Sequence, residues 1–229
     1  SQFALAKEVA RALGFHVIER EGFEADDILG TLSSLCARND CDCYVLTGDR
    51  DALQLIDPHV HVLLATNSDT IDYTEQVFFE KYGVMPCQFV DVKALMGDSS
   101  DHIPGVPGIG EKTALKLIAD YRSLDGVYDA LPDAPLTPSV KAKLKNGKDS
   151  AYLSQTLARI CREVPLGDSI QMWASEGIDR RAALQLFTRL EFSAYIKRMN
   201  LTEATENTPT DVKDTSERAV SATLIDLNH

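Results

Sequence analysis

The fold of this chain is decided by the stretch GDSSDHIPGVPGIGEKTA, which covers residues 97–114. Its two aspartates, Asp98 and Asp101, offer the hard oxygen ligands that Mg²⁺ and Mn²⁺ prefer. The glycines after them let backbone N–H groups approach a phosphate, and a helix beginning near Glu111 adds the positive end of its dipole. The pattern predicts two helices joined by a glycine-rich turn beside a metal site, and it indicates phosphodiester chemistry on nucleic acid.

Two lysines on the helix after this turn, Lys112 and Lys116, lie four residues apart and therefore share one helix face. In that position they can neutralise neighbouring phosphates. No base-reading side chain stands out, so we expect contacts with the DNA backbone that are independent of base sequence. The alternative is a helix-turn-helix used for packing alone.

Two further groups of acids precede this stretch, Glu24-Ala25-Asp26-Asp27 and Asp49-Arg50-Asp51. Carboxylates in such tight groups do not suit a packed core, because each buried unpaired charge is costly. They suit the surroundings of divalent cations, and we interpret them as metal ligands. Each group alone has a simpler alternative: acids at the start of a helix for the first, and an ordinary turn with a solvated ion pair through Arg50 for the second.

Hydrophobic periodicity predicts an α/β sheet in the first part of the chain and helices in the rest. The expected strands are 15–18, 43–47 and 60–64, and the expected helices among them are 3–13 and 24–37. This alternation favours a parallel sheet, in which ligands gather beyond the carboxyl ends of the strands. Helices are also expected at 74–82, 86–96, 111–121, 123–131, 138–145, 150–162, 179–187 and 192–199, with an extended stretch at 164–173.

These elements divide the chain into three expected regions. Residues 1–96 form an α/β metal-binding core, 97–200 a helical DNA-binding subdomain, and 201–229 an acidic tail. The tail is rich in Thr, Glu, Asp and Ser, which is typical of a linker or a disordered segment. Its last part, 222–226, reads as the first strand of a following domain.

The net charge of −12 is concentrated in a few places. The three acidic groups carry seven negative charges and residues 202–229 a net of four, which leaves about −1 for the rest and does not exclude a basic face. No run of about 18 apolar residues is present, so we expect no membrane span. The start of the chain lacks the layout of a signal peptide, and the five cysteines lack zinc-finger spacing. We therefore expect reduced thiols and a cytoplasmic location.

In their order and spacing these motifs resemble the 5′-3′ exonuclease domain of bacterial DNA polymerase I, in the structure-specific flap endonuclease family. The resemblance rests on Glu-Ala-Asp-Asp, Thr-Gly-Asp-x-Asp, Gly-Asp-x-x-Asp and the loop Gly-Val-Pro-Gly-Ile-Gly-Glu-Lys-Thr-Ala, and it covers roughly residues 3–200. It implies a PIN-like or resolvase-like α/β core with a partial parallel sheet, followed by a helical subdomain with a helix-three-turn-helix motif. The implied activity is two-metal hydrolysis of duplex and 5′-flap DNA.

The resemblance also assigns roles to single residues. The implied ligands of a first Mg²⁺ or Mn²⁺ ion are Glu24, Asp26 and Asp27, and those of a second are Asp49, Asp51, Asp98 and Asp101. The residues expected to act in catalysis are Asp26, Asp49, Asp51 and Asp98. Duplex DNA would be held by Gly105, Gly108, Gly110, Lys112, Thr113 and Lys116, and carbonyl oxygens of the loop could hold K⁺.

The chain departs from the family pattern at two places. His102 stands where the family has Asn after the last metal ligand. The family's first strand with its Asp-Gly pair, a further acid and a helical arch with Lys and Arg have no counterpart, so we hypothesise a fragment with an incomplete first metal site. Its expected partners include the missing N-terminal segment and downstream polymerase domains. The alternatives are a catalytically impaired duplex-DNA-binding module, and an acidic cation-binding or phosphatase-like α/β protein.

Overall fold

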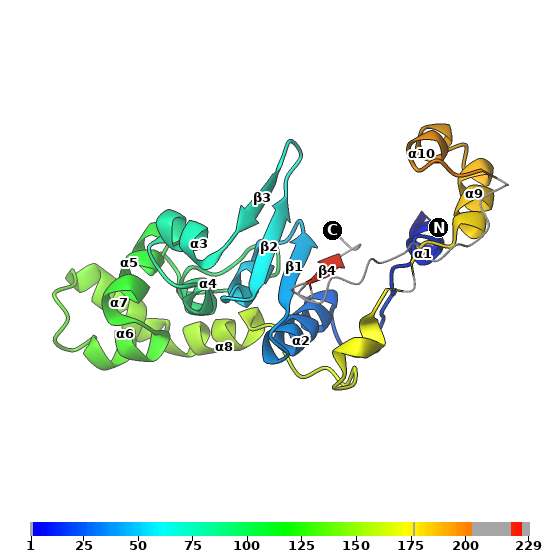
Figure 1. The fold of residues 1–229 in the computed structure, drawn as a ribbon. Coiled ribbons are helices and arrows are strands. Elements are labelled where there is room, and N and C mark those ends of the chain that lie inside the picture. Colours follow the sequence, from blue (N-terminus) through cyan, green and yellow to red (C-terminus); the bar gives the residue numbers. More distant parts are fainter. Residues whose placement is uncertain (1, 176, 203–220, 226–229) are drawn as a thin grey trace. The chain divides into compact units, whose positions relative to one another are not determined.

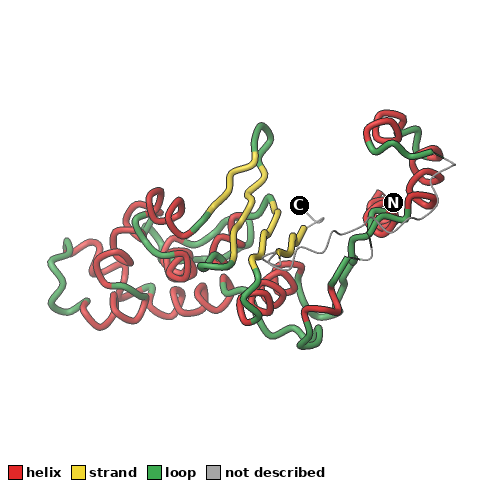
Figure 2. The backbone as a smooth tube through the Cα atoms, viewed as in Figure 1, coloured by secondary structure: helices red, strands yellow, loops and turns green. Residues whose placement is uncertain are grey.

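The computed structural model describes residues 2–175, 177–202 and 221–225. The chain divides into two compact units, whose elements are labelled in Figure 1 and coloured by type in Figure 2. Unit 1 comprises Ser1–Gly22 and Gly167–Ala219, and unit 2 comprises Phe23–Leu166 and Val220–His229. This division differs from the sequence-based regions that end at residues 96 and 200, and those regions stay a prediction.

Unit 2 contains a four-stranded sheet with the strand order β3-β2-β1-β4 (Figure 1). Its strands are β1 (Asp42–Thr47), β2 (Val60–Ala65), β3 (Thr70–Tyr73) and β4 (Ser221–Ile225). β1 pairs in parallel with both β2 and β4, whereas β2 and β3 are antiparallel. The expected parallel α/β sheet is therefore confirmed for three strands, and β3 makes the sheet a mixed one.

β1 alternates buried and half-buried side chains, as expected for a strand with one face on the core. Cys43 and Val45 are fully buried, and the strand ends at Thr47, just before the second acidic group. Helix α2 (Ala25–Arg38) packs against β1, and its apolar side chains Ile28, Leu29, Leu32 and Leu35 are all buried. Their helical spacing produces a single apolar face, which holds the helix on the sheet.

The remaining helices of unit 2 surround α4 (Phe89–Met96), which packs against α5, α6 and α8. α4 is almost entirely apolar, yet it also buries Asp91 and Lys93. The other helical elements are η1 (Arg50–Leu55), α3 (Glu75–Tyr82), η2 (Pro86–Gln88), α5 (Glu111–Tyr121), α6 (Leu124–Ala130), α7 (Pro138–Asn146) and α8 (Lys148–Ala158).

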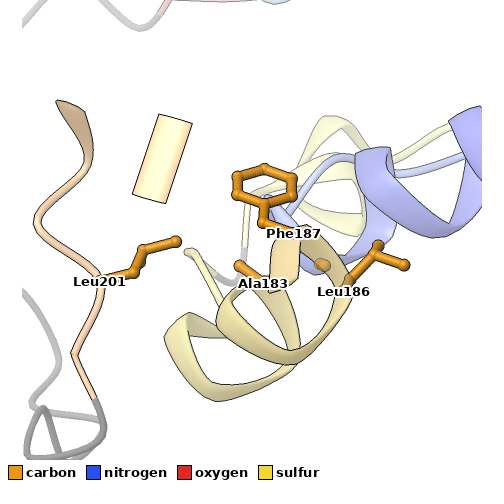
Figure 3. Close-up of a cluster of buried hydrophobic side chains, with 5 residues drawn as sticks. Ala183, Leu186, Phe187 and Leu201 are labelled. Carbon is orange, nitrogen blue, oxygen red and sulfur yellow. The ribbon is translucent and has the colours of Figure 1, made fainter. Parts of the chain in front are cut away.

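Unit 1 is a small helical assembly with an apolar cluster of its own. It contains α1 (Gln2–Ala12), η3 (Ile170–Trp173), α9 (Arg180–Arg189) and α10 (Ser193–Arg198). Figure 3 shows Ala183, Leu186 and Phe187 projecting from one helix, with Leu201 on a neighbouring stretch of chain. These residues and Ala12 are buried together. Among the described residues, no helix combines the length and the apolar character needed to cross a bilayer.

Several expected elements differ from those observed. Residues 15–18 form no strand, because no neighbouring strand pairs with them; instead the His16 ring contacts the carbonyl oxygen of Ala174 at 2.9 Å. The extended stretch predicted at 164–173 ends in the helical turn η3, so that prediction is wrong there. The sequence-based prediction also missed β3.

The C-terminal strand that we expected in a following domain is β4, which belongs to the sheet of this chain. The rest of the predicted tail, 203–220 and 226–229, lies outside the described residues.

Candidate functional site

Three carboxylates from two of the predicted acidic groups converge in unit 2. One ligand oxygen each from Asp51, Asp98 and Asp101 lies within 4.8 Å of the others. Asp51 belongs to η1 after β1, and the other two follow α4. Three carboxylates this close fit a hard divalent cation, whose ligands are oxygen atoms. Within the described part of the chain, this triad is the one group that meets such a spacing.

A buried lysine, Lys93, reaches into the same triad. Its ammonium bonds the Asp51 carboxylate, lies 2.8 Å from Oδ2 of Asp98 and lies 3.9 Å from Oδ2 of Asp101. The lysine side chain is 2% exposed, whereas those of Asp51 and Asp98 are 15% and 22% exposed. One cation therefore offsets part of the repulsion among three anions that would otherwise be unfavourable together.

Burial and ion pairing shift the pKa values in this cluster in different directions. Burial opposes the Lys93 charge, but hydrogen bonds to Asp51 and Asp98 outweigh it and raise the lysine pKa above its ordinary value. Burial raises the pKa of Asp51 despite the opposing bond from Lys93. Burial also disfavours the Asp98 anion, yet bonds from Lys93 and Ser100 prevail and lower its pKa to about 2. Lys93 and Asp98 are thus charged at neutral pH.

Lys93 was not among the residues that the sequence suggested. Its signal was a charged residue inside the apolar run of α4, which reads Phe-Val-Asp-Val-Lys-Ala-Leu-Met. A lysine that is buried in such a helix requires a partner of opposite charge. The other charged residue of the run, Asp91, accepts hydrogen bonds from the Leu124 amide and from the Gln155 side chain. Both positions are explained by these partners, which only the folded chain brings into contact.

Asp49 organises the turn that presents Asp51. Its Oδ1 accepts the backbone N–H of Asp51 at 2.8 Å, and its own N–H donates to the Thr47 hydroxyl at 3.0 Å. Asp49 is therefore the N-cap of η1, a position in which a short acidic side chain is favoured. Asp49 lies two residues before Asp51 in the sequence, and its carboxylate shapes the turn that carries Asp51.

The first predicted group, Glu24, Asp26 and Asp27, lies at the start of α2 and contributes no member to the triad. Oδ2 of Asp27 accepts the Glu24 backbone N–H at 3.1 Å, and Oδ1 accepts the Cys161 backbone N–H at 2.8 Å. The helix-capping alternative therefore describes Asp27 in this structure. Oδ1 of Asp26 is buried. The role of these three acids as ligands of a first metal stays a prediction.

The third acidic group is held in a closed loop. Asp98 and Ile103 exchange backbone hydrogen bonds of 2.9 and 2.8 Å, and Asp98 Oδ1 also accepts the Ser100 N–H at 2.9 Å. His102 is exposed and has a positive φ of 57°. This arrangement fixes the Asp98 side chain and leaves Asp101 on the outer part of the loop, where its side chain is 48% exposed.

The predicted glycine-rich turn, residues 105–110 and hereafter the hairpin, is anchored by α7 and α8. The Gly105 N–H donates to Ser154 Oγ at 2.9 Å, and the Gly105 carbonyl accepts from Ser150 Oγ at 2.6 Å. A Cβ on Gly105 would lie 2.3 Å from the Gly97 nitrogen, so no larger residue fits. At the other end, the Lys143 ammonium lies 3.1 Å from the Gly108 carbonyl oxygen. Gly105 is thus a buried packing position.

The remaining predicted DNA contacts are at the surface. Gly108, Gly110, Lys112 and Lys116 are exposed, and Thr113 is half-buried. Gly110 is the N-cap of α5, whose first turn carries Lys112 and Thr113. Val106 and Ile109 are 2% and 3% exposed, so the hairpin buries these apolar side chains, whereas Gly108 and Gly110 are exposed. An exposed glycine turn at a helix N-terminus is suited to an anion such as a phosphate.

Two family models match consecutive parts of the chain. The model described as 5′-3′ exonuclease, N-terminal resolvase-like domain, matches residues 1–83. The model described as 5′-3′ exonuclease, C-terminal SAM fold, matches residues 84–181. Together they cover strands β1, β2 and β3, the acidic triad, and the hairpin with its flanking helices.

Individual proteins agree with these models. DNA polymerase I of Caldicellulosiruptor bescii is 38% identical over 96% of this chain and 27% of its own length. The 5′-3′ exonuclease of Bacillus subtilis is 45% identical over 74% of this chain and 57% of its own length. The fold is similar to that of bacteriophage T5 flap endonuclease in a complex with DNA and metal ions, with a TM-score of 0.58, 24% identity, and coverage of 68% of this chain and 55% of that one. The chain thus spans only part of the proteins that it matches.

Proposed function

Since this chain belongs to the 5′-3′ exonuclease family found in bacterial DNA polymerase I, we propose that it hydrolyses DNA phosphodiester bonds as a 5′-3′ exonuclease and 5′-flap endonuclease. The observation that carries the proposal is the convergence of Asp51, Asp98 and Asp101. Acids from two distant parts of the sequence meet there, in the same unit as the exposed hairpin. The relative from Bacillus subtilis bears the name 5′-3′ exonuclease, which describes the same chemistry.

Asp51, Asp98 and Asp101 would hold Mg²⁺ or Mn²⁺, because their oxygen atoms are close enough to share one cation. When bound, such a cation lowers the pKa of a water molecule and stabilises negative charge on phosphate oxygen atoms. We retain Asp26 and Asp49 as further acids of this chemistry, and Glu24 and Asp27 as predicted ligands. In Asp27, backbone amides already engage both oxygens, so its contribution would be mainly to hold the start of α2.

Lys93 supports the site by charge compensation and by orientation. Its ammonium contacts all three carboxylates, and it is anchored on the buried helix α4. It keeps Asp98 ionised and holds the side chains of Asp51 and Asp98 close together before any cation arrives. It also supplies a fixed positive charge beside the oxygen atoms of a reacting phosphate, where a preorganised charge is effective.

The hairpin would hold duplex DNA through its backbone. Gly108 and Gly110 expose main-chain groups, and Lys112, Thr113 and Lys116 follow on α5. The similar T5 enzyme has been solved with DNA, which supports DNA as the ligand. The predicted K⁺ site at the hairpin carbonyls stays a prediction; Lys143 already supplies a positive charge at the carbonyl oxygen of Gly108.

The experiment is to incubate a labelled 5′-flap duplex with the chain and Mg²⁺ or Mn²⁺, and to follow the release of the flap. We expect cleavage that requires the cation and that Asp98→Asn reduces by at least about 100-fold, as for loss of a group that stabilises the transition state. Asp129→Asn is the matched control, because Asp129 is exposed on α6, away from the triad in the sequence.

The outcomes separate the alternatives. Cleavage that survives Asp98→Asn unchanged would contradict the proposed site. Binding of the duplex without cleavage would favour the catalytically impaired DNA-binding module. If the chain neither binds nor cleaves the duplex, and Lys112→Ala changes no measured property, the result would favour an acidic cation-binding protein without a nucleic-acid role.

A further inference from the structure

A hollow of about 430 Å³ lies on unit 2 outside both the acidic triad and the hairpin. It is lined by side chains from η1, β2, β3, α3 and the start of α5, including Arg50, Tyr73, Lys81, Tyr82 and Glu111. Its volume falls within the range of small-ligand sites, which is about 300–1,000 Å³. None of these residues has a role in the site described above.

Two cations of this hollow are held against the same aromatic ring. The Lys81 ammonium lies 5.2 Å from the centre of the Tyr82 ring and 5.1 Å from that of Tyr73. The Arg50 guanidinium carbon lies 5.9 Å from the Tyr82 ring centre, and Nη2 of Arg50 donates to the Tyr82 hydroxyl at 3.1 Å. Aromatic faces stabilise cations in such positions. Both cations therefore lie near the ring of Tyr82, and their contacts with it hold them in place.

The charge of the lining is not balanced. Glu111 is the single carboxylate among the lining residues, and it pairs with Arg50 at 3.3 Å. Lys81 bonds the neutral hydroxyl of Tyr73, and this bond raises the lysine pKa above its ordinary value. The Arg50 side chain is 52% exposed and Lys81 is also exposed, so both remain accessible. Two accessible cations with one carboxylate leave a net positive charge for an incoming anion.

The position of the hollow relates it to both parts of the proposed site. Arg50 stands between Asp49 and Asp51 in the sequence, and Glu111 is the first residue of α5, directly after the hairpin. The contact between Arg50 and Glu111 therefore joins the acidic loop to the end of the hairpin.

We propose that the hollow binds one nucleotide of the DNA substrate, with its phosphate at Arg50 and Lys81 and its sugar against the apolar wall that includes Ile71. Ile71 is 39% exposed and supplies apolar surface next to the cations. Phosphate is recognised by paired cations of this kind, and Arg in particular binds it through two parallel N–H groups. The proposal rests on the proposed function and adds a substrate subsite to it.

The test measures binding of a 5′-flap duplex in EDTA, so that cleavage plays no part, across a series of salt concentrations. Each phosphate contact contributes about 0.9 to the slope of log K against log salt concentration. We expect Lys81→Gln and Arg50→Gln each to weaken binding and, because both cations contact the same phosphate, the double substitution to reduce the slope by about that amount. Lys81→Arg, which keeps the charge, should retain the slope, and so should Lys197→Gln on α10.

A second measurement requires no substitution. Lysines of the unmodified chain are acetylated with and without the duplex, and the modified positions are identified by mass spectrometry. We expect the duplex to protect Lys81 and to leave Lys197 reactive. Full reactivity of Lys81 in the presence of bound DNA would overturn the subsite even if the substituted proteins fail to fold.

The two proposals fail in different ways. If Lys112→Ala weakens binding and lowers the slope while Arg50→Gln and Lys81→Gln leave both unchanged, the hairpin binds DNA and the nucleotide subsite is wrong. If the unmodified chain binds no duplex at all, the proposed function fails and the subsite fails with it.

Discussion

The ammonium of Lys93 lies 2.8 Å from Oδ2 of Asp98, on a side chain that is 2% exposed. We predict that Lys93→Met lowers the free energy of unfolding by about 1–3 kcal/mol in EDTA, because it leaves half-buried carboxylates without a cation. Mg²⁺ or Mn²⁺ should recover part of this loss, since a cation that binds only the folded state stabilises it. The measurement is the thermal unfolding midpoint with EDTA and with each metal.

The control for this prediction is the unmodified chain, in which the same metal should raise the midpoint by less. An equal rise in both proteins would mean that Lys93 and the metal do not share the triad. A variant with unchanged stability in EDTA would mean that Lys93 contributes little charge compensation.

Ser154 holds the hairpin from inside, because its buried hydroxyl accepts the Gly105 N–H. We predict that Ser154→Ala lowers the free energy of unfolding by about 1–3 kcal/mol, because a buried amide loses its acceptor. Thr156→Ala is the control: Thr156 is exposed on the same helix, and its substitution should cost less than about 0.5 kcal/mol. Urea denaturation of both variants gives the comparison, and equal losses would argue against the anchor.

Gly108 and Gly83 provide a matched pair of glycines with positive φ, 81° and 69°. Replacement of either by Ala should cost about 1–2 kcal/mol through backbone strain. Only at Gly108 would the new Cβ also meet the Lys143 ammonium, at 2.8 Å, whereas the space around Gly83 is open. We therefore predict that Gly108→Ala weakens duplex binding, measured by fluorescence anisotropy, and that Gly83→Ala does not. If the two variants bind the duplex with equal affinity, the hairpin is not part of the DNA-binding surface.

Tyr152 donates a hydrogen bond of 2.6 Å to Asp125, and burial together with this carboxylate raises the tyrosine pKa to about 12. The folded state therefore favours the neutral phenol. Its contribution to stability is complete below the unfolded pKa of about 10 and is lost as the pH rises from there towards 12. In Asp125→Asn, the titration followed by absorbance near 295 nm should gain a tyrosine that ionises at lower pH. An identical titration would show that Asp125 has no influence.

The sequence predicted the parts of this protein that depend on local chemistry. The apolar run Cys43 to Thr47 could only be a buried strand, and the glycines of the hairpin required a tight turn before α5. The spacing of Asp98 and Asp101 placed both on one loop. In the structure the Asp51 carboxylate lies close to those of Asp98 and Asp101, at the carboxyl end of a parallel strand.

Other features could not be read from neighbouring residues. Residues 15–18 alternate like a strand but have no strand to pair with, whereas 221–225 find one in β1, more than 170 residues away in the sequence. Asp27 looks like any acid of the first group, and only the approach of the Cys161 amide shows how it is used. Gly105 looks like its neighbours in the hairpin until α8 supplies the serines that engage its backbone.

By itself, the sequence indicated which chemistry to expect, because hard carboxylates and a glycine-rich turn at a helix start are fixed by residue type and spacing. The tertiary structure alone decided which acids lie close enough to share a cation, that a lysine lies among them, and that Arg50 and Lys81 both lie near the ring of Tyr82. The reason is physical: a local pattern sets backbone geometry and charge, whereas burial and long-range contacts determine which charges meet.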